Sequence, residues 1–182
     1  IEKTKNLAKK AFGNSDIFLE KFISNARHIE IQVFGLGEKK ALHFYERDCS
    51  IQRRFQKIIE ESPAPQIEKS IIDEMAESAV NFVTNQKYEG AGTIEYIYDI
   101  DNKKFYFLEM NTRIQVEHPV TETITNFDLV AMQIKFALNL DNNSIEQNKI
   151  NKSGHAIECR LYAEDPAKNF LPSPGKITKL KI

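Results

Sequence analysis

One short segment of this chain gathers the residue types that phosphoryl and carboxyl transfer use. Residues 109–117 read Glu-Met-Asn-Thr-Arg-Ile-Gln-Val-Glu, and Glu95 precedes them in a β-rich run. Carboxylate and amide oxygens suit a magnesium ion that is carried with substrate phosphates. An arginine fork suits carboxylate, phosphate or bicarbonate. The segment therefore predicts a site that binds a divalent cation with phosphate groups, and an anion beside them.

A predicted hairpin brings two of these carboxylates together. The β-rich runs 93–100 and 105–110 flank residues 101–103 and predict an antiparallel pair. With a three-residue loop, Glu95 lies directly opposite Glu109, and this like-charge pair destabilises the sheet unless a cation neutralises it. Asn111, at the next position on the same face, adds an amide oxygen. The hairpin thus predicts a divalent-cation site. One residue more or less in the loop would shift the strand register and separate Glu95 from Glu109.

The same alternation continues beyond Asn111 if the chain stays extended. Arg113, Gln115 and Glu117 then share the polar face, with Glu117 placed as a candidate general base. The opposite positions, expected to enter the core, are Leu108, Met110, Ile114 and Val116. An amphipathic strand with a solvated polar side is the competing interpretation. The opposed Glu pair and the lack of Lys, Ser and Thr on the polar face weigh against it.

Residues 47–57 form a second polar constellation. They contain three Arg, one Lys and two Gln. Such a cluster can hold an anion by charge-assisted hydrogen bonds. A solvated basic helix that pairs with Glu60 and Glu61 is the alternative, and spacing alone favours it slightly.

The histidines and cysteines have spacings that favour structural roles. His28, taken alone, is more consistent with an ordinary surface histidine on an edge strand. The other histidines lack the spacing of a transition-metal site; they are His43, His118 and His155. Cys49 and Cys159 are isolated from each other in the sequence, which favours free thiols in a reducing compartment.

The elements that must position these residues follow from periodicity. Residues 28–33 alternate strictly, with Ile29, Ile31 and Val33 on one face of a strand and polar residues on the other. Apolar residues at helical spacing predict a core-facing helix over 66–88, and a capping pattern at 125–128 precedes a helix over about 127–139. Further expected elements are a helix end at 1–13, strands at 41–47 and 156–162, polar segments at 48–62 and 141–153, and a loop at 171–175. Hairpins mixed with helices indicate an α+β architecture.

Composition sets outer limits on the kind of protein. The chain has 182 residues, 41% hydrophobic and 28% charged, with a net charge of -1. That charge balance argues against a dedicated nucleic-acid binder. Apolar runs are too short for a membrane span, and the N-terminus has no apolar signal core. The first residue is Ile1 and not Met, so we expect a piece of a longer chain.

Taken together, these segments resemble the biotin carboxylase family of the ATP-grasp superfamily. The matching stretches are 20–23, 27–33, 46–57, 90–95, 109–121, 154–160 and 163–166, and the run 109–121 is the most specific. The resemblance implies a partial ATP-grasp fold with an antiparallel sheet and flanking helices. Residues 1–50 would be the C-terminal part of the lid and adenine-binding region. Residues 51–182 would be the C-terminal catalytic region, running into the biotin carboxylase C-terminal segment from about 154.

The resemblance also implies a role for each candidate residue. ATP would be contacted by Glu20, Lys21, Ile23, His28, Gln52, Glu95 and Glu109. Magnesium or manganese ions would be held by Glu95, Glu109 and Asn111. Bicarbonate would be held by Lys57, Arg113, Gln115 and the backbone of Val116, and biotin would be contacted by Arg160.

The chemistry that the resemblance implies starts from bicarbonate. Glu117 would deprotonate it, so that it attacks the γ-phosphate of ATP and gives carboxyphosphate and ADP. That intermediate would release carbon dioxide and phosphate, and the phosphate would take the ureido proton of biotin on a carrier protein. The resulting biotin enolate, stabilised by Arg113, would attack the carbon dioxide, and Lys57 would complete the catalytic set. Phosphoryl transfer depends mainly on positioning and charge neutralisation, which suits the polar face described above. The expected function is the first half-reaction of a biotin-dependent acyl-CoA carboxylase, of the acetyl-, propionyl- or methylcrotonyl-CoA type.

Partners and setting are also implied by the family. We expect a biotin carboxyl carrier, a carboxyltransferase and a homodimer of the full biotin carboxylase, with no nucleic-acid or membrane partner. The expected location is the cytoplasm, or the mitochondrial matrix in a eukaryote.

Two departures from the family pattern limit these expectations. Phe55 stands where many members carry a histidine near the nucleotide. The family's catalytic unit is longer, and its N-terminal domain, glycine-rich lid and ATP-binding lysines would lie upstream of Ile1. We therefore expect that this chain alone does not turn over ATP.

Two alternative functions are kept. The first is another ATP-grasp ligase, such as the purine-pathway carboxylase or half of a carbamoyl-phosphate synthase. The continuation of 113–118 as Arg-Ile-Gln-Val-Glu-His favours biotin carboxylase over these. The second is a non-catalytic fragment or paralogue that only packs against partners, and the retained charged residues of the site argue against it for the parent protein.

Overall fold

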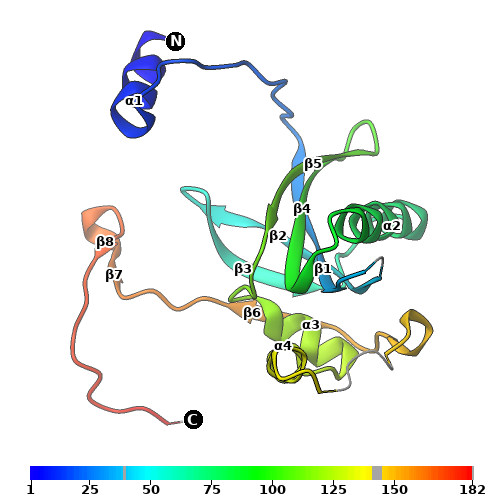
Figure 1. The fold of residues 1–182 in the computed structure, drawn as a ribbon. Helices are drawn as coiled ribbons and strands as arrows, with labels where there is room; N and C mark the ends of the chain where they lie inside the picture. Colours follow the sequence, from blue (N-terminus) through cyan, green and yellow to red (C-terminus); the bar gives the residue numbers. More distant parts are fainter. Residues whose placement is uncertain (39, 141–144, 182) are drawn as a thin grey trace.

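Six antiparallel strands form the main sheet of the protein. The computed structural model describes residues 1–38, 40–140 and 145–181. The strand order is β5-β4-β1-β2-β3-β6 (Figure 1). The strands are β1 (Ala26–Leu36), β2 (Ala41–Arg53), β3 (Gln56–Ser62), β4 (Glu89–Asp99), β5 (Lys104–Asn111) and β6 (Ala156–Cys159). This confirms the predicted antiparallel sheet.

Helices and short elements complete the chain. The helices are α1 (Glu2–Phe12), α2 (Lys69–Asn85), α3 (His118–Thr125) and α4 (Leu129–Ala137). Short 3-10 helices are η1 (Gln147–Lys149) and η2 (Pro166–Lys168), and β7 (Glu164–Asp165) pairs with β8 (Leu171–Pro172). Together with the sheet, these elements form the predicted α+β architecture.

The hydrophobic core forms because the sheet has an apolar stripe on each face. Helix α2 buries the predicted helical stripe, including Met75 and Val83, against Ile29 and Ile31 of β1 and Ile94 of β4. A second buried cluster contains Phe34, Leu42, Phe44, Ala91, Leu129, Met132 and Ile150. In Figure 1, α2 lies on one side of the sheet, and α3 and α4 lie together directly below the sheet in this view. Polar residues of the central strands are therefore covered as well, and they must be paired.

The first helix lies apart from this core. Helix α1 has no buried residue and ends at Gly13, whose φ of 76° is the left-handed conformation that stops a helix. This confirms the predicted helix end at 1–13. Residues between α1 and β1 carry exposed apolar side chains, among them Phe18 and Phe22. Figure 1 shows α1 joined to the sheet by a long extended segment.

The polar segment 48–62 is a β-hairpin. Strand β2 continues to Arg53, and β3 begins at Gln56 after a turn in which Arg54 and Phe55 have φ values of 53° and 63°. Asp48 pairs with Glu61 and Gln52 with Lys57 across the hairpin. The alternative of a solvated basic helix is therefore wrong, because the strand pairing uses the backbone that a helix would need.

The hairpin β4–β5 has a different loop from the predicted one. Asp99 pairs with Lys104, so four residues and not three separate the strands. A register shift between Glu95 and Tyr96 then moves the pairing by one residue, and Glu95 still lies opposite Glu109. The predicted pair is correct although the predicted loop is wrong, because a bulge compensates for the extra residue.

Two further predictions about helices need correction. The helix over 118–125 was not predicted, and the chain is not extended between β5 and this helix. The N-cap of α4 is Asp128, whose side chain accepts a hydrogen bond from the amide of Ala131 at 2.7 Å. Thr125 instead lies in the last turn of α3 and donates to the carbonyl of Thr121. The capping pattern therefore predicts the start of α4 three residues too early.

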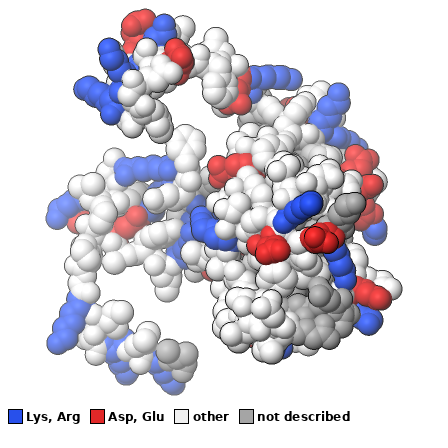
Figure 2. Space-filling model, viewed as in Figure 1, with Lys and Arg blue, Asp and Glu red and all other residues white. Residues whose placement is uncertain are grey.

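The visible surface is mixed in charge. In Figure 2, basic and acidic side chains are interspersed over the main body of the molecule. No helix in the described part of the chain combines the length and apolar character that crossing a membrane requires.

Candidate functional site

Lys57 forms the centre of a buried charge network. Its ammonium group contacts the carboxylate of Glu30, lies 3.0 Å from Oε1 of Glu95, and lies 2.6 Å from Oε1 of Glu117. These residues come from β3, β1, β4 and the N-cap of α3. The sheet order β4-β1-β2-β3 would keep Lys57 two strands from Glu30, and the length of the lysine side chain bridges that gap.

A second buried cation, Arg47, stabilises the same network through Glu30 and Gln115. Arg47 is fully buried, and its guanidinium donates to Oε2 of Glu30 at 3.0 Å and to Oε1 of Gln115 at 2.9 Å. Its other acceptors are Gln32 (2.7 Å), Thr121 (3.0 Å) and Thr93 (3.2 Å). A buried guanidinium needs this many acceptors, because an unpaired buried charge is costly.

The predicted basic cluster at 47–57 is therefore divided among different partners. Arg47 is enclosed and is not available to an anion. Arg53 pairs with Glu164, and Arg54 donates to the carbonyl of Asn169. Only Lys57 of these cations faces the candidate site. Sequence reasoning gave Glu30 no role; the signal available for it was its place on the polar side of a strictly alternating strand.

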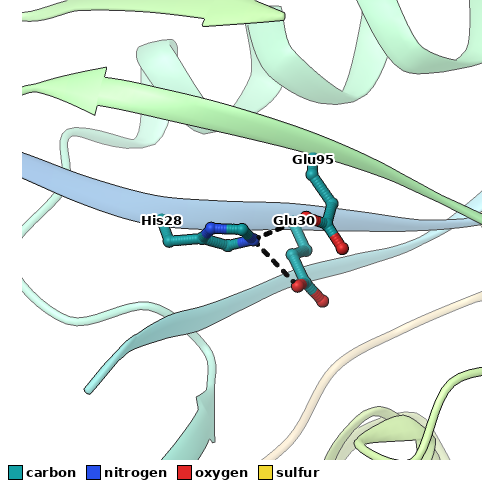
Figure 3. A group of neighbouring side chains, drawn as sticks. All are labelled: His28, Glu30 and Glu95. Atoms are coloured by element: carbon teal, nitrogen blue, oxygen red, sulfur yellow. Dashed lines mark hydrogen bonds and ion pairs between the residues drawn. The ribbon is translucent and has the colours of Figure 1, made fainter. Parts of the chain in front are cut away.

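His28 belongs to the network and is not an isolated surface residue. Figure 3 shows its ring with Nε2 directed at two carboxylates, 3.1 Å from Oε1 of Glu30 and 3.0 Å from Oε2 of Glu95. Among the described residues, this trio and the trio of Glu30, Cys49 and Glu117 have ligand atoms within 4.8 Å of one another. Both trios share Glu30, whose carboxylate already binds Lys57 and Arg47. We assign neither trio as a metal site, since these cations already neutralise it.

The predicted metal ligands lie at the open edge of this network. Glu95 is buried and Glu109 is exposed, on neighbouring strands. The amide nitrogen of Asn111 lies 2.8 Å from Glu95 and 3.3 Å from Glu109, and its amide oxygen accepts from Arg113 at 3.3 Å. Two carboxylates and an amide fit magnesium or manganese, provided that the amide presents its oxygen.

The segment after Asn111 reaches the site by a turn and not by an extended strand. Gln115 and Glu117 are buried in the site, and the amide of Gln115 donates to Oε1 of Glu95 at 2.9 Å. Val116 is 59% exposed and Leu108 is 45% exposed. Both were predicted to enter the core, and that prediction is wrong. Met110 and Ile114 do pack against the two core clusters. Alternation failed here because the chain turns into α3.

Arg160 closes the site from the side of β6. Its Nε donates to Oε1 of Glu60 at 2.6 Å, and its Nη2 donates to Oε2 of Glu117 at 2.9 Å. Tyr162, which sequence reasoning did not select, donates to the backbone carbonyl of Lys57 at 3.1 Å. Glu117 is thus held between one lysine and one arginine.

Two adjoining cavities contain nearly all of the predicted site residues. The first, of about 360 Å³, is lined by His28, Gln52, Phe55, Gln56, Lys57, Glu95, Glu109, Asn111, Arg113, Gln115, Val116, Glu117, Arg160 and Tyr162. The second, of about 540 Å³, adds Lys21, Phe22, Ile23, Ser50 and Leu108. The two share His28, Gln52, Phe55, Glu95 and Glu109. Glu20 is exposed and lines neither cavity.

A further cavity of about 610 Å³ lies elsewhere, between β2, α2 and residues 147–152. Its charged side chains pair with one another, as in the contact of Lys152 with Glu46 at 2.9 Å. The candidate chemistry is therefore placed in the two adjoining cavities, where charged groups face the open space.

Glu95 and Glu117, two of the buried carboxylates of the site, are ionised at neutral pH. Burial is the largest single influence on Glu95 and raises its pKa, but the hydrogen bond from His28 and the charge of Lys57 outweigh it and lower the pKa to about 2. Burial also raises the pKa of Glu117, and the hydrogen bond and charge of Lys57, with Arg47, bring it below its usual value. Glu117 is therefore available as a proton acceptor.

Comparison with known proteins agrees with this geometry. The family described as carbamoyl-phosphate synthase L chain, ATP binding domain, matches residues 1–144. Biotin carboxylase 1 of Bacillus subtilis is 50% identical over 177 residues, which is 97% of this chain and 39% of that protein. The chain therefore spans about two fifths of the length of this relative.

Solved structures lead to the same group. A complex of biotin carboxylase with β-γ-ATP from Campylobacter jejuni superposes with a TM-score of 0.87 at 47% identity, covering 96% of this chain and 38% of that chain. The biotin carboxylase domain of a thermophilic 2-oxoglutarate carboxylase bound to bicarbonate gives a TM-score of 0.85 at 46% identity, covering 94% and 38%. The fold is thus that of part of an ATP-grasp biotin carboxylase.

Proposed function

This chain belongs to the family of the carbamoyl-phosphate synthase L chain ATP-binding domain, and from that premise we propose that its parent protein carboxylates biotin with ATP and bicarbonate. One observation carries the proposal. A single cavity collects a lysine, two arginines, an ionised glutamate and the opposed Glu95/Glu109 pair. Positioned cations and a ready proton acceptor are what carboxyl activation by ATP requires.

ATP and its metal ions fit the outer part of the site. We assign adenine contacts to Lys21 and Ile23 in the second cavity, with His28 and Gln52 at the junction of the two cavities. We also propose an ATP contact for Glu20, although it lines neither cavity. Glu95, Glu109 and Asn111 would hold magnesium or manganese, which would neutralise phosphate charge. Relatives of known structure include one whose name records a complex with β-γ-ATP.

Bicarbonate fits the inner part of the site. Lys57, the exposed guanidinium of Arg113, the amide of Gln115 and the backbone of Val116 face one cavity. We assign the general base to Glu117, whose ionised carboxylate would take the proton of bicarbonate. The bicarbonate oxygen would then attack the γ-phosphorus of ATP, releasing ADP and forming carboxyphosphate. Lys57 and Arg113 would offset the charge that gathers during this step.

Biotin would enter beside Arg160, which lines the same cavity. We also propose two domain boundaries for the parent protein. The lid and adenine region would end near residue 50, and the C-terminal segment would begin near residue 154. A biotin carrier, a carboxyltransferase and a homodimer are proposed for it as well. One related structure is described as a domain dimer.

The names of related proteins point to several acceptors of the carboxyl group. Relatives at 48–49% identity carry names that refer to methylcrotonoyl-CoA carboxylase, urea amidolyase and pyruvate carboxylase. These names imply different acceptors for similar segments. We propose an acyl-CoA acceptor, and assays of the parent protein with acyl-CoA, pyruvate and urea would identify it.

The proposed activity is tested by ATP hydrolysis in the full-length parent protein. We expect hydrolysis that depends on bicarbonate and is stimulated by free biotin, and that is lost on removal of divalent cations. Hydrolysis that biotin does not stimulate would favour the alternative of another ATP-grasp ligase. A parent protein without bicarbonate-dependent hydrolysis would contradict the proposal.

A further inference from the structure

A second pair of opposed glutamates lies next to Arg160. Glu60 of β3 is the direct cross-strand partner of Glu158 of β6. Side chains in that position start about 5 Å apart at Cβ and project to the same face. Glu60 is fully buried, and one oxygen of each carboxyl group is buried without a hydrogen-bond partner among the described residues.

Two ionised carboxylates are an unfavourable occupant of this place. Arg160 donates to one oxygen of Glu60, and no other cation contacts the pair among the described residues. A buried carboxylate oxygen without a donor carries a full desolvation cost. One proton placed between the two groups removes one charge and supplies the missing donor at once.

We propose that Glu60 and Glu158 share one proton, and that this singly charged pair positions Arg160 against Glu117. Arg160 is the only side chain in the described site that bonds both Glu60 and Glu117, at 2.6 Å and 2.9 Å. With one proton on the pair, the guanidinium is shared between two single negative charges. Loss of that proton doubles the charge on one side and draws Arg160 away from Glu117.

The surroundings of the pair agree with a retained proton. Burial raises the pKa of Glu60, and Arg160 offsets this only in part, with Glu117 and Lys57 as the other charged neighbours. Burial likewise raises the pKa of Glu158, the charge of Glu60 adds to it, and Arg160 and His118 oppose it. Cys49, on β2, is buried and burial raises the pKa of its thiol, so it stays neutral and adds no charge.

The shared proton does not depend on the proposed function, whereas the catalytic effect of positioning Arg160 rests on it. The shared proton is a property of the folded protein. The positioning of Arg160 affects catalysis only if Glu117 and Arg160 act on bicarbonate and biotin as proposed. Measurements of stability and of kinetics therefore fail separately.

The stability test compares Glu158→Gln with the unchanged full-length parent protein. A folded-state pKa above the unfolded value of 4.5 means that stability is full below pH 4.5 and is lost as pH rises through the folded value. Glu158→Gln cannot ionise, so its melting temperature should rise relative to the parent protein between pH 5 and pH 9, by about 2 °C or more. A difference that stays flat over this range overturns the shared proton.

A matched control and a second measurement cover failure of the variant to fold. Glu61→Gln changes the neighbouring residue of β3, which pairs with His155 at 3.3 Å, and it should give no gain in stability at high pH. In the unchanged protein labelled with carbon-13 at its Glu side chains, infrared spectra at pH 6 should contain a protonated carboxyl band. Absence of that band overturns the proposal even if Glu158→Gln is insoluble.

The kinetic test separates positioning from folding. The KM for free biotin should rise with pH in the parent protein by about fivefold relative to Glu158→Gln, as expected when a hydrogen bond shifts to a more charged acceptor. The KM for ATP should not share this dependence. Equal pH dependence of both constants in the variant and the parent protein overturns the positioning role.

Discussion

Two pairs of glutamates face each other across the same sheet, and they are accommodated in opposite ways. Glu95 and Glu109 pair across β4 and β5, and Glu60 and Glu158 pair across β3 and β6. The pKa of Glu95 is lowered to about 2 in spite of burial, whereas the pKa values of Glu60 and Glu158 are raised, chiefly by burial. In both pairs the two glutamates are direct cross-strand partners. The difference lies in what surrounds each pair.

Donors decide the outcome. Glu95 receives contacts from His28, Lys57, Asn111 and Gln115, while the second pair receives Arg160 on one oxygen only. Burial penalises a carboxylate unless charged or polar donors compensate for the lost water. Like charges in register are therefore not by themselves a sign of a metal site; the donors and open space around them carry that information.

The largest effect is expected from Lys57→Met. This change leaves the carboxylates of Glu30, Glu95 and Glu117 without their shared cation, which should cost about 3–5 kcal/mol of stability. Bicarbonate-dependent ATP hydrolysis by the parent protein should be lost. Urea unfolding measures the first and a coupled ATPase assay the second.

The control for that variant is Lys69→Met. Lys69 is an exposed lysine that pairs with Asp73 on α2, and its removal should change stability by no more than about 0.5 kcal/mol. If Lys57→Met were equally mild, the contrast between the two glutamate pairs would not depend on donors.

The next effect concerns acid stability. The pKa of Glu95 falls from 4.5 in the unfolded chain to about 2 in the folded one. Its contribution, on the order of 3 kcal/mol, is therefore present above pH 4.5 and is lost as pH falls toward 2. Glu95→Gln should flatten the loss of unfolding free energy between pH 5 and pH 3.

The pair of Glu60 and Glu158 should change stability with pH in the opposite direction to Glu95. Glu158→Gln should leave the acid limb of the stability curve unchanged and act only above pH 4.5, because the pKa of Glu158 is raised. An acid limb that both variants flatten equally would mean that the two pairs do not differ in ionisation.

A smaller effect is expected for metal binding. Glu109→Gln removes a proposed direct ligand, and Mn²⁺ affinity should fall by at least about tenfold, since even supporting residues around a metal cost that much. Mn²⁺ titration followed by electron paramagnetic resonance measures it in the parent protein. Glu61→Gln, at a residue that lines neither of the two cavities, should keep the original affinity; a similar drop there would show that charge alone is responsible.

The smallest effect is expected at the rim between the two cavities. Phe55 is 98% exposed and lines both of them. Because no buried contact is lost, Phe55→His should change the KM for ATP by less than about fivefold and leave stability within about 0.5 kcal/mol. A larger change in KM would mean that this residue contacts the nucleotide in the complete protein.

The β4–β5 hairpin marks how far sequence reasoning reached. The pairing of Glu95 with Glu109 was predicted from a three-residue loop, but the loop has four residues and a bulge restores the register. Bulges have no reliable local signature, since they are selected by the packing of both strands. The alternation beyond Asn111 also failed, because Gln115 and Glu117 enter the site from a turn before α3.

What the sequence determined was the chemical inventory and its order. The run 109–117, with Glu95, was enough to predict a carboxylate, amide and arginine site, since residue types and spacing fix which groups a strand and its neighbours can present. The amphipathic patterns of β1 and α2 likewise predicted the core that supports it.

The tertiary structure alone decided which of these groups meet and in which state of charge. It enclosed Arg47 within five acceptors, where the sequence left open an anion-binding cluster or a solvated basic helix, and it drew Lys57 to three carboxylates. It also placed Glu60 and Glu158, a pair that the sequence did not predict, beside Arg160. Burial and donor placement arise from residues far apart in the chain, and these set pKa values that no local pattern contains.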